Sequence, residues 1–300
     1  MYSTYVPWPG DSSVIRRSSL RRYVFAGPIT TLSCGVCSSS MFAETASPSS
    51  ESPIYGVQTG VLTNVKGIPD FINIRHHVFT VVCLRGSLSA ADCGGVDLEL
   101  RQPIADFAAK ERSELPWFVD PVSNKLAGGF DACDSCRLSS GSDIFHWTFV
   151  LLLHLAFPPQ PDQTKTQTQT PGFPSSTIEL KSAVAATDRD PRWGTLTFYE
   201  SSPDVQRYFC SRCSACVFYT TNGRPELVDL AIGLLNTKNG SRVEELVSWD
   251  FGGKMGWRQD VAGGWRESFV GRIEAAADHW RIERGYPKSW RRIQKEEAAG

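Results

Sequence analysis

The residues most capable of chemistry in this 300-residue chain are cysteines at the spacing of metal ligands. Separate pairs of the form Cys-x-x-Cys are Cys34/Cys37, Cys133/Cys136 and Cys210/Cys213, and Cys216 repeats the spacing after Cys213. Such a turn presents two thiolates from one loop, and zinc prefers four ligands of this kind in a tetrahedron. The total of nine cysteines is odd and most are clustered, which favours a zinc protein over a secreted disulfide framework. A redox dithiol is the alternative, but no βαβ pattern surrounds the pairs.

Two of these pairs belong to an internal repeat. In both, Ser follows the second Cys directly and Phe lies five residues beyond that Cys, as Phe42 and Phe218. The similarity continues in residues 57–62 and 230–235, each with Gly at its fourth position. A repeat of this kind indicates one module present twice. The first copy begins so close to Met1 that we expect no upstream cysteine to complete its ligand set.

Other residues could join a metal site. Cys216 would extend the second pair, but the repeat has Ser40 at the equivalent position, which favours a small buried side chain over a ligand. Cys83 lies in an apolar segment and takes the same interpretation. Among the five histidines, His146 follows Cys136 most closely and is the one that we expect near a metal.

Composition narrows the partners and the compartment. Lys and Arg total 31 against 32 acidic residues, a formal charge of −1, so no basic footprint for nucleic acid is present. The chain opens without a basic start or an apolar run, which argues against a secretory signal. Arginines among serines at 16–22 resemble a mitochondrial presequence, but this stretch also matches residues 201–209. The apolar run 149–157 is shorter than the roughly 20 residues that cross a bilayer. We expect a soluble cytoplasmic protein without nucleic-acid or membrane partners.

The elements that must position these cysteines are mainly strands. Residues 54–62 and 77–83 are β-branched and aromatic, with Gly and Pro between them. Residues 103–115 form helix well and have Pro in the first turn, while apolar residues at helical spacing predict an amphipathic helix over 265–280. The remaining predictions are one or two buried strands in 144–157, a mobile loop in 158–176 and a short strand in 195–199.

A longer set of motifs runs through the chain in a specific order. The motifs are Leu84-Arg-Gly, Cys93-Gly-Gly-Val, the block 130–141 containing Cys-Asp-Ser-Cys-Arg-Leu-Ser-Ser-Gly, Tyr199-Glu-Ser-Ser-Pro and the block 207–214. With them, residues 84–260 resemble the family of glutathione-dependent formaldehyde-activating enzymes and centromere protein V, especially its fungal members. Residues 20–80 resemble the C-terminal half of a second such domain. The expected domains are therefore a partial one in 1–80, a complete one in 81–260 and a helical tail in 261–300.

The resemblance implies a fold and two metal sites. The fold is a β-tent, in which antiparallel sheets surround zinc. In the family an early Cys-x-Cys joins the late Cys-x-x-Cys around a structural zinc, which by position gives Cys93, Cys210 and Cys213 here, with Ala91 replacing the first Cys. A middle Cys-x-Cys-x-x-Cys holds a second zinc through three thiolates and leaves one coordination position of the metal open for the substrate's sulfur. Its positions are Asp131, Cys133 and Cys136 in this chain, so a carboxylate replaces one thiolate.

The resemblance also implies an activity, a carbon–sulfur lyase acting on the adduct of a thiol such as glutathione with an aldehyde. The open zinc near Asp131, Cys133 and Cys136 would carry it. The amino-terminal copy keeps Cys34 and Cys37 as candidate ligands without partners. Two alternatives stay open. One is a non-catalytic zinc scaffold or interaction module of the same fold. The other is a single zinc ribbon made by the pairs Cys133/Cys136 and Cys210/Cys213.

Overall fold

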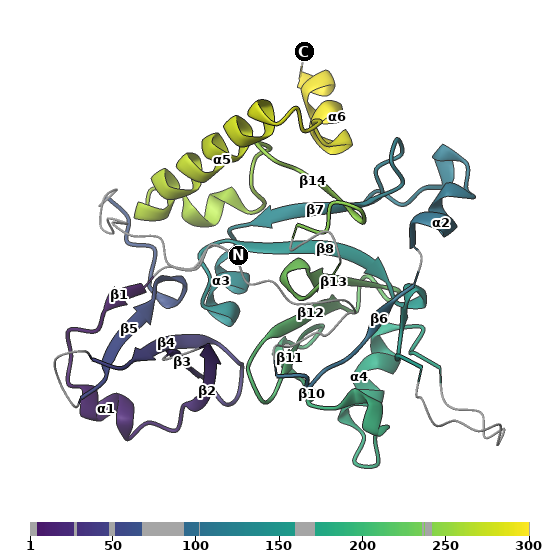
Figure 1. The fold of residues 1–300 in the computed structure, drawn as a ribbon. Helices are drawn as coiled ribbons and strands as arrows, with labels where there is room; N and C mark the ends of the chain where they lie inside the picture. Colours follow the sequence, from purple (N-terminus) through teal and green to yellow (C-terminus); the bar gives the residue numbers. More distant parts are fainter. Residues whose placement is uncertain are drawn as a thin grey trace.

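The computed structural model describes residues 5–26, 29–47, 52–67, 93–101, 103–159, 172–235, 237 and 242–299 (Figure 1). Several predictions fall outside these ranges: the strand at 77–83 with Cys83, the start of the complete domain at 81, Ala91, and most of the loop at 158–176. The described chain is a mixed α/β fold with several antiparallel sheets. The expected antiparallel sheets are present, but helices form a larger part of the fold than the sequence suggested.

The amino-terminal unit, which comprises the described part of residues 5–67, is built on a five-stranded sheet of order β1-β5-β4-β3-β2. Its strands are β1 (Tyr5–Pro7), β2 (Arg21–Ala26), β3 (Ile29–Ser33), β4 (Ser40–Thr45) and β5 (Ile54–Gln58). Helix α1 (Ser12–Arg16) is capped by Asp11, whose side chain accepts from the Ser13 amide. A small core of Ile15, Leu32 and Tyr55 holds α1 against the sheet.

The large unit, which comprises the described part of residues 93–299, is built on a seven-stranded sheet of order β10-β11-β12-β13-β8-β7-β14. Its strands are β7 (Leu126–Asp131), β8 (Phe145–Leu151), β10 (Leu196–Ser202), β11 (Val205–Cys210), β12 (Cys216–Thr221), β13 (Leu227–Ala231) and β14 (Val247–Trp249). All pairs are antiparallel except β14 with β7. Strands β6 (Glu99–Leu100) and β9 (Leu155–Ala156) make a separate two-stranded sheet.

Helices surround the large sheet. They are α2 (Pro103–Ala108), α3 (Asp134–Ser140), α4 (Thr177–Ala185), α5 (Trp265–Glu283) and α6 (Trp290–Ala299). Short 3₁₀ helices occupy Thr59–Val61, Arg112–Glu114, Leu152–His154, Pro191–Trp193, Ile232–Leu234 and Arg258–Val261. Helices α5 and α6 lie along the β7–β14 side, and α3 lies between the two units (Figure 1). Among the described helices, none has the length and apolar character needed to cross a bilayer.

The predicted elements compare closely with the observed ones. The apolar run 144–157 gives β8 and β9, and the strand at 195–199 extends as β10. The C-terminal helix predicted for 265–280 is confirmed as α5, which continues to Glu283. The helix predicted for 103–115 stops as α2 at Ala108. Helices α1, α3 and α4 were not predicted, although Ser176 accepts from the Glu179 amide as the N-cap of α4, a spacing that marks helix starts. Helix α6 lies in the helical tail expected for 261–300.

The repeat seen in the sequence is present in the backbone. Strands β2–β5 and β10–β13 have the same order, and both carry a bulge at the end of the strand that enters the Cys-x-x-Cys knuckle. Leu32 pairs with Phe42 as Tyr208 pairs with Phe218. Ser38 and Ser214 leave the knuckles with matching positive φ values of 62° and 63°. The two copies therefore share one strand framework.

Candidate metal centres

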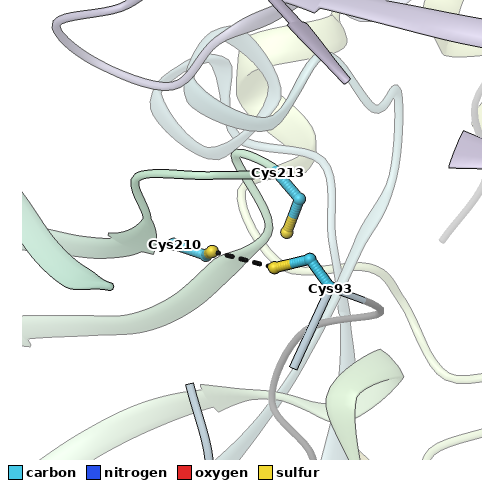
Figure 2. A group of neighbouring side chains, drawn as sticks. All are labelled: Cys93, Cys210 and Cys213. Atoms are coloured by element: carbon cyan, nitrogen blue, oxygen red, sulfur yellow. Dashed lines mark hydrogen bonds between the residues drawn. The ribbon is translucent and has the colours of Figure 1, made fainter. Parts of the chain in front are cut away.

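The first candidate centre joins Cys93 to the knuckle of Cys210 and Cys213 (Figure 2). The three sulfurs lie within 4.8 Å of one another, and the Cys93 and Cys210 sulfurs are 3.4 Å apart. Cys93 lies shortly before β6, and the knuckle connects β11 to β12. The centre thus ties the beginning of the large unit to its sheet.

Local backbone bonds build this knuckle. The Cys210 amide donates to the Ala215 carbonyl at 2.9 Å, and the Ser214 amide donates to the Cys210 carbonyl at 2.9 Å. The Thr195 hydroxyl lies 3.0 Å from the Cys210 sulfur. Gly95 passes so close that a Cβ there would lie 2.2 Å from the Thr195 hydroxyl and 3.1 Å from the Cys93 sulfur. A side chain at this position would have to displace the Thr195 hydroxyl or the cysteine sulfurs, which explains the glycine at 95.

The electrostatics of this centre are those of thiols packed together. Hydrogen bonds from Cys213 and Thr195 lower the pKa of Cys210 to about 4 despite its burial. The negative Cys210 sulfur, together with burial, raises the pKa of Cys213. The pKa of Cys93 is raised by burial and by the same sulfur. Only a cation placed between the sulfurs would allow all three to ionise, and thiolates are the ligands that zinc accepts.

The second candidate centre comprises Asp131, Cys133 and Cys136, whose ligand atoms also lie within 4.8 Å of one another. Asp131 ends β7, Cys133 is the N-cap of α3, and Cys136 lies in the first turn of that helix. The Asp131 carboxylate accepts from the Cys133 amide at 2.7 Å, and the Cys133 sulfur accepts from the Cys136 amide at 3.1 Å. A strand end and a helix start therefore fix all three donors.

Burial dominates the electrostatics of this second centre. Both cysteines are 7% exposed. The pKa of Cys133 is raised by its hydrogen bond with Cys136 and by burial. Burial also raises the pKa of Asp131, although the Cys133 amide and the Arg207 charge oppose the shift. As in the first centre, a divalent cation would balance the negative charge of the donors. Two thiolates and a carboxylate are a set that fits zinc.

This second centre opens on a cavity of about 810 Å³ that lies against one face of the large sheet. Strands β8, β11, β12 and β13 contribute Trp147, Arg207, Tyr219 and Asp229 to its lining. Arg207 is 5% exposed, donates to the Ser135 hydroxyl at the start of α3, and lies over the Tyr219 ring at 4.9 Å. Asp229 pairs with Arg224 at 2.8 Å, and burial raises its pKa to about 6. The donors therefore face a space large enough for a small molecule.

The amino-terminal unit supports the helix that carries Cys136. Arg137 of α3 is 3% exposed and donates to the carbonyls of Gly60 and, at 2.5 Å, of Leu62. Gly60 lies against the end of α3 so closely that a Cβ there would lie 2.2 Å from the Gly141 backbone. The unit is thus packed directly behind the second centre.

A buried ion pair locks the same junction. The Arg266 guanidinium of α5 lies 3.0 Å from the Asp143 carboxylate, and both side chains are 0% exposed. Arg266 also donates to the carbonyls of Thr59 and, at 3.2 Å, of Leu62. The Thr59 hydroxyl in turn donates to Asp143. One arginine therefore joins the amino-terminal unit, the segment after α3 and the C-terminal helix.

The remaining candidates lie elsewhere. Cys34 and Cys37 form the knuckle between β3 and β4, but no third Cys, His, Asp or Glu donor joins them among the described residues. The Cys37 and Val36 amides lower the pKa of Cys34 by hydrogen bonding to its sulfur, and the Arg21 charge adds a smaller contribution. Arg21 runs beside this knuckle and donates to the Ser211 carbonyl of the other knuckle.

Cys216 and His146 belong to neither three-residue group. Cys216 packs in the apolar cluster around Cys133 and Cys136, which agrees with its interpretation as a small buried side chain. His146 packs against Phe130 and Trp249, and burial lowers its pKa well below the usual value. The pairs Cys133/Cys136 and Cys210/Cys213 fall in separate groups, so they do not form the single zinc ribbon in this structure.

Comparisons of the chain with protein-family models, with curated proteins and with solved structures gave no match. The site therefore has to be understood from its own geometry. Three candidate functional residues were not predicted from the sequence. They are Thr195, beside the first centre, and Arg207 and Asp229, in the cavity. Arg207 and Asp229 are flanked by buried residues along β11 and β13, but nothing in the sequence says which sheet face borders a cavity.

Proposed function

We propose that this chain is a zinc protein of the glutathione-dependent formaldehyde-activating type. It would have a β-tent fold and act as a carbon–sulfur lyase on the adduct of a small thiol and an aldehyde. The observation that carries the proposal is the second centre: three donors of zinc-binding type at the wall of an 810 Å³ cavity. Three protein ligands and an open coordination position are typical of catalytic zinc, whereas structural zinc sites have four protein ligands.

The proposal divides the two centres by role. Cys93, Cys210 and Cys213 would hold a structural zinc, because they fasten the start of the large unit to the β11–β12 knuckle. Asp131, Cys133 and Cys136 would hold the zinc at the reaction site. A zinc ion bound there would lower the pKa of a substrate thiol and polarise a carbonyl.

The residues of the cavity would handle the remaining chemistry. In the addition direction, the substrate would react as its thiolate, its proton having passed to solvent. The sulfur forms a bond to the aldehyde carbon, and the carbonyl oxygen gains the electron pair of its broken π bond. That oxygen needs a proton, which the Asp229 carboxyl would donate. In the lyase direction Asp229 would take the proton back as the carbon–sulfur bond breaks. A carboxyl with a pKa of about 6 can do both near neutral pH. Arg207 would hold the start of α3, and hence Cys136, in place.

The first test is the metal content of protein purified without chelator. We expect two zinc ions per chain by elemental analysis, because thiolate sites retain zinc through purification. Protein without any zinc would refute the proposal at its base.

The second test uses cobalt in place of zinc. Millimolar glutathione should change the visible spectrum of the cobalt-loaded protein, because a new sulfur ligand alters the metal's absorption bands. S-Methylglutathione is the matched control, since it has no free thiol and should change nothing. Asp131→Ala should weaken metal retention at the second centre, while Asp131→Cys should strengthen it. A spectrum that glutathione leaves unchanged would instead support a non-catalytic zinc scaffold.

The third test follows the reaction itself. Exchange NMR can measure the rate at which glutathione and formaldehyde interconvert with S-hydroxymethylglutathione. The zinc-loaded protein should accelerate this exchange, and Asp229→Asn should slow it by about 10²-fold, as expected for loss of a proton-transferring group. An exchange rate equal to the rate measured without protein would show that the protein lacks the proposed activity.

A further inference from the structure

The rim of the cavity is formed in part by helix α6. Arg291 and Lys295 are four residues apart on this helix, so they share one face, and both line the cavity. The helix lies in the tail beyond residue 260, which neither the internal repeat nor the family resemblance covers. The rim is therefore a feature of this chain's own extension.

Helix α6 is firmly attached where it borders the cavity. Ser289, just before the helix, accepts from the Arg292 amide at 3.1 Å and donates to the Asp250 carboxylate. Arg292 is bound to Asp278 at 2.7 Å. At the same end of the helix, the Arg112 guanidinium lies over the Trp290 ring at 4.3 Å. These contacts fix which face of α6 borders the cavity.

The charges on α6 are segregated between its faces. Glu296 is bound by Lys288 at 2.6 Å and by Arg292 at 2.9 Å, away from the two cavity-lining cations. No ion pair joins Arg291 or Lys295 to a carboxylate among the described residues, and Arg291 lies over the Trp117 ring at 5.6 Å. Two positive charges on the cavity face of α6 are thus left without an acidic partner in the part of the chain that the structure describes.

The acidic residues of the cavity are bound to other groups. Asp131 accepts from the Cys133 amide, Asp229 pairs with Arg224, and Asp260 accepts from the Asp134 amide at 3.0 Å. Asp250 accepts from Ser289. Asp229 has a cation as its partner, and the other three carboxylates keep their charge, but among the described residues none of the four forms an ion pair with Arg291 or Lys295. Those two cations therefore have no carboxylate bound to them there and can contact a ligand.

We propose that Arg291 and Lys295 form an anion-binding rim that selects a small molecule with carboxylates at the end opposite its reacting group. This inference rests on the proposed function for the position of the reacting group, which would lie at Asp131, Cys133 and Cys136. The cavity volume of about 810 Å³ suits a molecule long enough to reach both ends. A carboxylate-bearing thiol would then bind with its sulfur at the floor and its carboxylates at the rim.

The test is calorimetric titration of the zinc-loaded full chain with S-methylglutathione and with its diethyl ester. S-Methylglutathione carries two carboxylates but no free thiol, so its binding does not depend on the metal centre having a free place. The wild-type chain should bind the acid more tightly than the ester. The double variant Arg291→Ala/Lys295→Ala should bind the acid about tenfold more weakly, as expected for two partly solvated charge contacts, and should bind the ester as before.

The matched control is Arg272→Ala/Arg284→Ala, which removes the same charge from α5 and its end without touching the cavity. It should bind the acid as the wild type does. Any of three results would overturn the proposed anion-binding rim. They are equal affinity of the wild type for acid and ester, equal affinity of the rim variant and the wild type for the acid, and no binding of the acid. An unchanged cobalt spectrum with glutathione would overturn the proposed function alone, because S-methylglutathione binding is measured separately.

Discussion

The two copies of the repeated framework carry different side chains on equivalent strand positions. One row of paired residues across β11, β12 and β13 is Arg207, Tyr219 and Asp229, and the equivalent row across β3, β4 and β5 is Thr31, Ala43 and Gly56. The first row lines the cavity. In the second row, Gly56 is packed against Tyr5 of β1. The same strand order thus gives a charged cavity wall in one copy and a closed, small-residue surface in the other.

The two Cys-x-x-Cys knuckles also differ in the side chain that lies beside them. The knuckle of the large unit meets a third cysteine, Cys93, whereas the amino-terminal knuckle meets Arg21. The amino-terminal copy has instead become a support, because its Thr59–Val61 turn and Leu62 bind Arg137 and Arg266. The comparison teaches that one strand framework can carry a candidate metal centre in one copy and packing contacts in the other. The following predictions can break or sharpen that comparison.

The largest difference is expected between matched knuckle variants. Cys213→Ser should lower the free energy of unfolding by roughly 5 kcal/mol or more and release one zinc ion, because metal binding at such sites is part of the folding energy. Cys37→Ser should cost less than about 1 kcal/mol and release none, since Cys37 has no three-donor group. Chemical denaturation and elemental analysis measure both. Equal losses would show that the amino-terminal knuckle also holds metal.

The supporting role of the amino-terminal unit depends on the Arg266–Asp143 pair. Arg266→Ala should destabilise the protein by about 3–5 kcal/mol, because it removes the guanidinium that balances the buried Asp143 charge and donates to the Thr59 carbonyl. Arg242→Ala is the matched control, since the pair of Arg242 and Glu244 is exposed and should contribute less than about 1 kcal/mol. Urea denaturation measures both changes. Similar small values would mean that the unit is not locked through this pair.

A smaller effect is expected from close packing at the same junction. Gly60→Ala should destabilise by about 1–3 kcal/mol, because its Cβ would lie 2.2 Å from the Gly141 backbone and force the two segments apart. It should also weaken cobalt retention at the second centre, since α3 carries Cys136 and ends at Gly141. Gly129→Ala, whose Cβ would meet no atom within 4 Å, is the control. An unaltered cobalt affinity in Gly60→Ala would separate the amino-terminal unit from the site.

The paired residues Arg207, Tyr219 and Asp229 of the large unit predict a pH effect that the equivalent residues of the amino-terminal unit lack, because those include no titratable side chain. Burial raises the pKa of Asp229 from 3.8 to about 6, so the folded state binds more protons than the unfolded state between these values. The stability that Asp229 contributes is therefore present below about pH 4 and lost as the pH rises through 6. Asp229→Asn should gain up to about 2 kcal/mol relative to wild type between pH 4 and pH 7. A difference that does not change with pH would mean that Asp229 titrates normally.

The sequence predicted the local features well. The knuckles, the strand predicted at 195–199 and α5 follow from short-range patterns of cysteine, serine and apolar residues, and the structure confirms them. The bulges at the strand ends were not predicted. The grouping of Cys93 with Cys210 came from the resemblance, and the separation from Cys133 and Cys136 was left open. Spacing alone could not decide it, because which pairs meet depends on how the strands associate. The roles of Arg207, Asp229 and Arg266 depend on contacts between distant segments, which periodicity does not encode.

The contacts of Arg266 also constrain the order in which the chain can assemble. Asp143, Thr59 and Leu62 leave the ribosome long before α5 does, and β7 likewise precedes its parallel partner β14. During synthesis the strands of the amino-terminal unit can pair by themselves, since their hairpin contacts are local, whereas closure of long-range contacts is slower. Until α5 emerges, Arg266 is absent. This residue joins Asp143, which follows α3, to Thr59 and Leu62 of the amino-terminal unit. A nascent chain that stops short of α5 would therefore lack the guanidinium that joins the amino-terminal unit to the segment after α3.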